Sequence, residues 1–231
     1  TIYSVVCAAK QHSAVKEIIV VDNASTDRTQ ERAISAGATV VECSKVGLGY
    51  AMKAGVAKAR SRYILRSDAD IDNWQPDWIE LLLPSETNSL TRGIYRSPYS
   101  QLPMSNYVVR PYLELFKPEW AHIPIPTTGT YLFDRNNYNF DLLPNNWAID
   151  IAILFRALET HPEKVKNILI GTLSDRQRQV PHYIQMATDL ASFMMCYFKV
   201  GVASLITQES IQNTDDQLGL KGQQFVDFPL S

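Results

Sequence analysis

Short runs of β-branched and apolar residues alternate with amphipathic stretches along the first third of the chain. The apolar runs are typical of strands that are covered on both faces of a parallel sheet. They lie at residues 3–6, 17–21, 38–42 and 62–66. Residues 28–36 and 49–60 have helical spacing, and Gly37 is expected to end the first helix. Repeated β-α-β units predict a right-handed, Rossmann-like, mostly parallel α/β sheet with ligands at the carboxyl ends of its strands.

The pattern changes from about residue 75, because nine prolines between residues 76 and 144 keep the elements short. The later predicted helices cover residues 111–116, 147–158 and 183–198, and the predicted strands residues 130–133 and 165–171. We therefore divide the chain into residues 1–75, residues 76–206 and a polar tail, residues 207–231.

The connection between the first two predicted strands is unusually short. It spans residues 7–16, whereas a parallel crossover normally needs a dozen residues or more and includes a helix. Either the connection is very tight, or a mobile stretch is missing from the sequence. We favour the second interpretation.

Composition excludes several classes of protein. The 231 residues carry a formal net charge of −2 and are 45% hydrophobic, so no nucleic acid partner and no disordered chain are expected. Three cysteines without a C-x-x-C pair and no basic leader favour a cytoplasmic protein. The apolar stretch at residues 191–206 is too short for a membrane anchor and contains Lys199. Its residues 193–198 are compatible with a homodimer.

Acidic residues follow two of the predicted strands. Asp22 ends the second strand, and Asp68 and Asp70 follow the fourth. The carboxyl ends of strands share one crevice in an open parallel sheet, so these carboxylates are expected to converge there. Two carboxylates spaced in this way can hold a divalent metal, Mg or Mn, that neutralises a diphosphate. The alternative is that Asp68 and Asp70 cap the next helix or face solvent.

Three segments in order strengthen the first interpretation. They are IIVVDNASTDRT at residues 18–29, the glycine-rich helix start at residues 47–49, and YILRSDAD at residues 63–70. Together they resemble the nucleotide-sugar domain of GT-A glycosyltransferases of the family-2 type. The resemblance implies that Asp22 contacts the base, Asp68 the ribose and Asp70 the metal. It also places Gly47 and Gly49 at the donor. The family has Gly-Lys-Gly there, but Leu48 stands at the lysine position, so Lys45 or Lys53 would supply the charge.

The second half is similar to two related enzyme families. Residues 70–79 and 147–150 are similar to mannosylglycerate synthases, and residues 92–96, 109–120 and 124–131 to glucosyl-3-phosphoglycerate synthases. The resemblance implies a metal-dependent retaining enzyme with an acceptor-binding C-terminal half. Its donor would be a nucleotide sugar of the UDP-glucose or GDP-mannose type, and its acceptor a small glycerate-type molecule.

The same resemblance implies roles for four further residues. Asp150 would accept a hydrogen bond from the acceptor hydroxyl or the sugar, and Arg96 would pair with the acceptor carboxylate. Gly129 and Thr130 would offer backbone N–H groups to that carboxylate. The simpler alternatives are a helix N-terminal charge for Asp150 and a surface position for Arg96.

Several family features are missing. The family's Gly-Gly-Arg, a loop that binds the acceptor phosphate, is missing near residues 101–104. Its metal-binding histidine is missing from residues 172–178, although His182 follows. An inverting family-2 enzyme acting on a lipid or polymer and a non-catalytic sugar-nucleotide binder therefore stay open. A dinucleotide-binding Rossmann protein is a further alternative, since Gly47-x-Gly49 opens a helix, but Met52 replaces the third glycine.

Overall fold

The computed structural model describes residues 2–83, 89–97, 102–173 and 179–200. The chain clusters into two units, Thr1–Ser192 and Phe193–Ser231. All strands described lie in the first unit, and the second contains the last turn of α7 (Val180–Tyr197). The sequence-based boundaries after residues 75 and 206 stay predictions. Within the described residues, no helix has both the length and the apolar character needed to cross a membrane.

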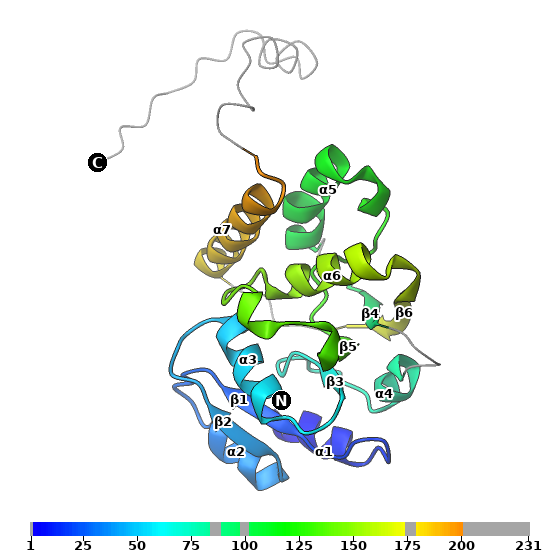
Figure 1. Ribbon diagram of the computed structural model, residues 1–231. Helices are drawn as coiled ribbons and strands as arrows, with labels where there is room; N and C mark the ends of the chain where they lie inside the picture. The colour runs from blue at the N-terminus through cyan, green and yellow to red at the C-terminus, as the bar shows by residue number, and fades with distance from the viewer. Residues whose placement is uncertain (1, 84–88, 98–101, 174–178, 201–231) are drawn as a thin grey trace, which may run out of the picture. The chain divides into compact units, whose positions relative to one another are not determined.

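The N-terminal part of the first unit is a two-stranded parallel sheet with helices (Figure 1). β1 (Ile19–Asp22) pairs with β2 (Thr39–Glu42), and Ile19 lies opposite Thr39. The elements around them are α1 (Ile2–Lys10), α2 (Thr29–Ala36) and α3 (Leu48–Lys58). Gly37 ends α2 in the left-handed conformation, at φ 91°, as predicted.

The predicted strand at residues 3–6 is wrong, because these residues belong to α1. Ile2 and Val6 are both buried, one helical turn apart, and they pack against Ala33 and Ala36 of α2. Helix-compatible residues, Ala8 to Lys10, continue the segment. In the described part of the chain, no strand therefore precedes β1, and residues 7–16 are not a crossover between two strands. The expectation of a missing mobile stretch there is wrong for the same reason.

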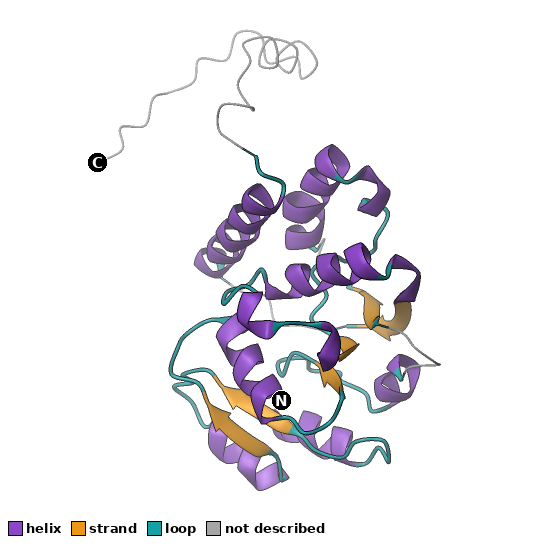
Figure 2. Ribbon diagram, viewed as in Figure 1, coloured by secondary structure: helices purple, strands orange, loops and turns teal. Residues whose placement is uncertain are grey.

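The other strands form a second sheet in the order β3-β5-β4-β6. Figure 2 shows the strands of both sheets in orange. They are β3 (Tyr63–Arg66), β4 (Leu90–Arg96), β5 (Tyr131–Asp134) and β6 (Val165–Thr172). β4 and β6 are parallel, and β5 runs antiparallel to both β3 and β4. The sequence did not predict β4, whose middle carries the residues Thr91-Arg92-Gly93.

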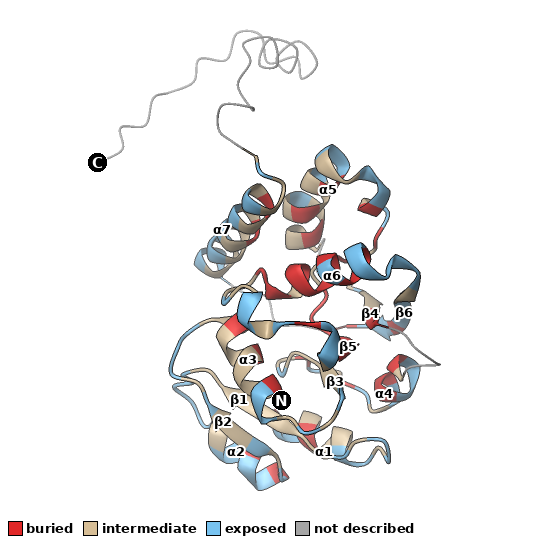
Figure 3. Cartoon of the chain, viewed as in Figure 1, coloured by how far each residue is buried: buried red, intermediate tan, exposed pale blue. Residues whose placement is uncertain are grey.

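The two faces of the second sheet have different partners. Leu65 and Leu132 pack with α4 (Asp77–Leu82), a helix that the sequence pattern did not reveal. On the other face lies α6 (Ile149–Thr160), which is almost entirely buried along its inner side (Figure 3). Shorter helical segments complete the first unit: Met104–Val109, α5 (Arg110–Phe116), Pro118–Trp120, Arg135–Asn137, Phe140–Leu142 and Pro162–Lys164.

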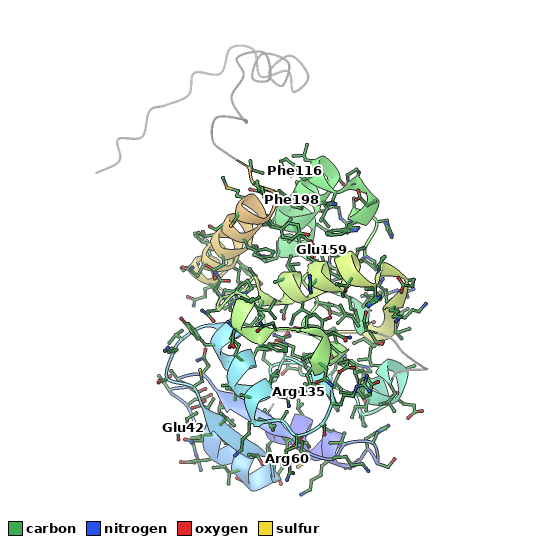
Figure 4. The ribbon with its side chains drawn as sticks, viewed as in Figure 1. Glu42, Arg60, Phe116, Arg135, Glu159 and Phe198 are labelled. Atoms are coloured by element: carbon green, nitrogen blue, oxygen red, sulfur yellow. The ribbon has the colours of Figure 1, made fainter. Side chains whose placement is uncertain are left out.

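Two features connect the N-terminal part to the second sheet. A cavity of about 490 Å³ is lined by both parts: by β1 and α3 of the N-terminal part and by β3 of the second sheet. It reaches Asp68. Arg135, which follows β5, donates from its guanidinium to the carbonyl of Ala59 at the end of α3 (Figure 4). The donor-side and acceptor-side residues predicted from the sequence therefore belong to one body, the first unit.

Candidate active site

The end of β3 carries an arginine, Arg66, that forms an ion pair with Asp68. Arg66 Nη2 lies 2.8 Å from Asp68 Oδ1, and the Arg66 guanidinium also donates to the carbonyl of Gly129. The side chain of Arg66 is 11% exposed and that of Asp68 is 44% exposed. One side of the Asp68 carboxylate is thus held by the protein, while the residue remains open to solvent.

Asp150 reaches the same place from the first turn of α6. The hydroxyl of Tyr131 donates to Asp150 Oδ1 at 2.6 Å, and Arg66 Nη2 lies 3.7 Å from Asp150 Oδ2. The side chain of Asp150 is only 10% exposed. A cavity of about 70 Å³ is lined by both carboxylates together with Thr127, Trp147 and Arg66. The structure therefore brings together Asp68 and Asp150, which are far apart in the sequence.

Burial and charge compete at this cluster. Burial raises the pKa of Asp150 above its usual range, and Asp68 adds to that effect, while Arg66 and the Tyr131 hydroxyl oppose it. Burial disfavours the charged form of Arg66, but Asp150 and Asp68 outweigh this and raise the pKa of the guanidinium. Burial and the neighbouring Asp150 together raise the pKa of Tyr131, so its hydroxyl stays a donor.

Cross-strand register sets the position of these side chains. Tyr131 lies opposite Arg66 in β3 and opposite Arg92 in β4. Directly opposite residues point to the same face of a sheet, so both arginines flank Tyr131 beneath Asp150. Arg92 is 1% exposed, donates to Asn167 Oδ1 at 2.7 Å, and has its pKa lowered to about 10 by burial.

The predicted acceptor-binding residues, Gly129 and Thr130, lie next to the ion pair of Arg66 and Asp68. A Cβ on Gly129 would overlap the Arg66 guanidinium and the Asp68 carboxylate, so any larger residue there would have to displace these side chains. The Thr130 N–H donates to Thr128 Oγ1 at 3.3 Å, and the Thr130 carbonyl accepts from Gly93 at 2.8 Å. Both backbone groups of Thr130 are thus engaged within the protein.

The predicted donor-side aspartate, Asp22, ends β1. Its Oδ1 atom is buried and has no hydrogen-bond partner among the described residues. The next residue, Asn23, donates to the carbonyls of Cys43 and Lys45 at 3.0 and 2.7 Å and accepts from the Gly47 N–H at 2.9 Å. Asn23 therefore fixes the loop after β2 against the end of β1, a role that the sequence analysis did not identify.

The glycines before α3 are required by close packing. A Cβ on Gly47 would meet the carbonyl oxygen of Asn145 at 2.6 Å, and one on Gly49 would overlap the backbone of the same loop. Lys53 donates to Leu143 O and Asn145 Oδ1 at 2.7 and 2.6 Å, which also ties α3 to that loop. Lys45 is exposed, and its Nζ lies 5.4 Å from the ring centroid of Tyr50. Binding of donor phosphates by these residues stays a prediction.

Of the remaining candidate residues, Arg96 and Asp70 lie at or after the ends of strands, and His182 lies in α7. Arg96 ends β4, is exposed, and has no side-chain partner among the residues described. Asp70 is half-buried in the turn after β3. His182 packs against Trp147, with ring centroids 5.0 Å apart. Residue 101 and residues 174–178, where the phosphate loop and the metal histidine were sought, lie outside the described residues.

Sequence reasoning missed Arg66, Tyr131 and Arg92. Arg66 and Arg92 share one signal, a charged residue inside a strand that is otherwise apolar or buried. Such a residue must be paired, because an uncompensated charge is costly to bury. Tyr131 gave no comparable signal, since tyrosine is common in strands.

Comparisons with known proteins agree with this architecture. A family model described as glycosyl transferase family 2 matches residues 2–149. The glucosyl-3-phosphoglycerate synthase of Mycobacterium tuberculosis (strain CDC 1551 / Oshkosh) is 23% identical over 206 residues, which cover 78% of this chain and 64% of that protein. The one from Mycolicibacterium paratuberculosis is 27% identical, covering 78% and 63%. The chain thus spans less than two thirds of the length of these relatives.

Solved structures show the same fold. The crystal structure of the M. tuberculosis glucosyl-3-phosphoglycerate synthase with Mn²⁺, UDP-glucose and phosphoglyceric acid has a TM-score of 0.79 and 24% identity, covering 87% of this chain and 76% of that one. A crystal structure of a mycobacterial protein also has a TM-score of 0.79 at 24% identity, covering 88% and 72%. The predicted α/β GT-A fold is confirmed.

Proposed function

Because this chain belongs to glycosyl transferase family 2, we propose that it is a retaining enzyme that transfers a hexose from a nucleotide diphosphate sugar to a small glycerate-type acceptor. One observation carries the proposal. Asp68, predicted to bind the donor, and Asp150, predicted to act on the acceptor hydroxyl or the sugar, line a single cavity. Donor and acceptor groups must lie within a few ångströms of each other for transfer, and the shared small cavity supports such an arrangement.

Asp22 supports the donor side of the proposal. A buried carboxylate oxygen without a hydrogen-bond partner is costly, and a base N–H donor would satisfy it. Asp68 would bind the ribose, and Lys45, Gly47 and Gly49 would lie along the phosphates.

A divalent cation, Mg²⁺ or Mn²⁺, fits the carboxylates only when it is shared with a substrate. The described residues bring no three His, Cys, Asp or Glu side chains together as a metal site. Such ions are commonly held by one or two carboxylates plus substrate phosphate oxygens, and Asp70 would supply the carboxylate here. When bound, the ion stabilises the charge that develops on the departing diphosphate.

The acceptor would lie between Arg96 and Asp150. Arg96 is exposed at the end of β4 and would pair with the acceptor carboxylate. Asp150 would orient the acceptor hydroxyl by accepting its hydrogen bond, with Gly129 lining the same place. In the transfer, the bond from the anomeric carbon to the diphosphate breaks with its electron pair on the diphosphate. The acceptor oxygen forms the new bond, and its proton passes to the diphosphate or to water.

The relatives name the first substrates to test. They are glucosyl-3-phosphoglycerate synthases, and one crystal structure contains UDP-glucose and phosphoglyceric acid. We therefore infer UDP-glucose and 3-phosphoglycerate as the leading pair, with GDP-mannose and glycerate as the alternatives. We place the reaction in the cytoplasm. A homodimer through residues 193–198 stays a prediction that light scattering on the purified protein tests.

A thermal-shift screen of nucleotide sugars, with and without Mn²⁺, tests the donor. The correct donor is expected to raise the melting temperature most, and only with the metal present. Transfer is then followed by ¹H NMR, which reports the anomeric configuration of the product. Retention supports the proposal, whereas inversion contradicts it. No stabilisation by any nucleotide sugar would overturn the assignment altogether.

The matched test of the metal role is Asp70→Asn beside Asp72→Asn, a nearby acidic residue with no assigned role. D70N is expected to lose metal-dependent transfer, and D72N to retain it. Equal activity of the two variants would contradict the role of Asp70.

A further inference from the structure

Arg66 is the one charged residue in a strand that is otherwise made of Tyr63, Ile64 and Leu65. Its side chain is 11% exposed, so its charge has little contact with water. It occupies the last position of β3, directly opposite Tyr131 in β5. A strand end supported by a cross-strand partner is a rigid place from which to position other groups.

The guanidinium joins three segments that are distant in sequence. Nη2 lies 2.8 Å from Asp68 Oδ1 and 3.7 Å from Asp150 Oδ2, and Nη1 donates to the carbonyl of Gly129. Both carboxylate contacts are made by Nη2, and the planar guanidinium fixes the direction of Nη2 because Nη1 is held by the Gly129 carbonyl. Asp68 and Asp150 therefore have their relative position set by one side chain.

Charge supports the same conclusion. Asp150 is held between Arg66 on one oxygen and the Tyr131 hydroxyl on the other. The charged groups around it are Asp68 beyond β3, which favours its protonated form, and Arg92 on β4, which favours its charged form. Without Arg66, Asp150 would lose a neighbouring positive charge while Asp68 remains, and the pKa of Asp150 would rise further.

We propose that Arg66 is a positioning residue for glycosyl transfer, which holds Asp150 at a fixed distance from Asp68. The inference rests on the proposed function, because it concerns the same site. The role proposed for Arg66 differs from that of an arginine in a purely structural ion pair. Arg62 is an arginine of the second kind. Arg62 precedes the same strand and pairs with Asp134 at 2.6 Å, but it is 62% exposed and contacts neither site carboxylate.

The experiment compares Arg66→Gln and Arg66→Lys with the control Arg62→Gln. In R66Q the turnover number is expected to fall about 100-fold, because a displacement of about 1 Å in a catalytic group has that effect. The acid limb of its pH–rate profile should move to higher pH, since Asp150 is protonated more easily. R66K keeps the charge, so its pH profile should stay close to wild type while turnover still falls. R62Q should match wild type in both.

A second readout does not depend on turnover. The carboxyl titration of Asp150, followed by ¹³C NMR, should move to higher pH in R66Q and stay unchanged in R62Q. If R66Q does not fold, R66K carries the kinetic test, since an ammonium has no second nitrogen for the Gly129 carbonyl and so is not held in a fixed direction between the two carboxylates. Full turnover in R66K would then overturn the proposal.

The two possible failures are distinguishable. If wild type binds a nucleotide sugar and transfers the hexose, but R66Q has the turnover and Asp150 titration of R62Q, the role of Arg66 is refuted and the function stands. If wild type neither binds a nucleotide sugar nor transfers a hexose, the function fails and the positioning role fails with it.

Discussion

Replacing Tyr131 with phenylalanine removes one hydroxyl from the candidate site and leaves the ring in place. That hydroxyl donates to Asp150 Oδ1 at 2.6 Å, and Tyr131 is 2% exposed. A hydrogen bond to a charged group contributes about 1.5–3 kcal/mol, and burial leaves little room for water to replace it. We expect Y131F to lower the free energy of unfolding by that amount at neutral pH. For a chain of this size the melting temperature should fall by about 3–12 °C.

The effect should depend on pH with a definite sign. Burial raises the pKa of Asp150 above that of the unfolded chain, so ionised Asp150 destabilises the folded state as pH rises through this window. The Tyr131 hydroxyl reduces that cost, because it donates to the charged form. The destabilisation by Y131F should therefore be full above the raised pKa of Asp150 and shrink as the pH falls through it.

Thermal melts over a pH series, followed by circular dichroism, measure both effects. Tyr138→Phe is the matched control, because Tyr138 is also buried but its hydroxyl has no hydrogen-bond partner among the described residues. Removing that hydroxyl should leave the melting temperature unchanged or raise it. The reasoning is refuted if Y131F and Y138F melt alike at neutral pH, or if the loss in Y131F grows as the pH falls.

Three further substitutions test the surroundings of the site. Gly129→Ala should reduce turnover about 100-fold in steady-state assays, because its methyl group displaces Arg66; wild-type turnover would contradict the close packing. Asn23→Ala removes three hydrogen bonds and should destabilise the fold by about 1–3 kcal/mol in urea titrations, with weaker binding of nucleoside diphosphates by calorimetry. Arg92→Lys loses contacts to Asn167 and two backbone carbonyls, and should cost about 3 kcal/mol in the same titrations; no change would show that these contacts are replaceable.

The sequence predicted most elements and failed where local patterns were ambiguous. Residues 147–158 are apolar except for Asp150 and Arg156, and this run is too long for a strand, so α6 was clearly marked. The apolar run at residues 3–6 is too short for periodicity to distinguish a strand from a helix, and packing against α2 decides for the helix. β4 escaped detection because Arg92 interrupts it, and a buried arginine is acceptable only when distant groups satisfy its donors.

The sequence was enough to predict some of the residues at the site, but not which residues contact one another there. Asp68 and Asp150 stood out because carboxylates after a strand and in a first helical turn suggest chemistry on their own. Arg66 did not, because its contacts with Asp68, Asp150 and Gly129 depend on which segments the fold brings together. No local pattern encodes that neighbourhood.

The register between β3 and β5 is the step that creates the site. Arg66 lies opposite Tyr131, and Leu65 lies opposite Leu132, so the leucines point to the face that packs on α4. A slip of one residue in β5 would turn Tyr131 toward α4 and bring Leu132 to the face beneath Asp150. Burying a tyrosine hydroxyl against α4 while exposing a leucine to the charged cluster is unfavourable on both faces. The apolar packing on α4 therefore fixes the register that places Arg66 and Tyr131 around Asp150, and the geometry of the polar face depends on the apolar one.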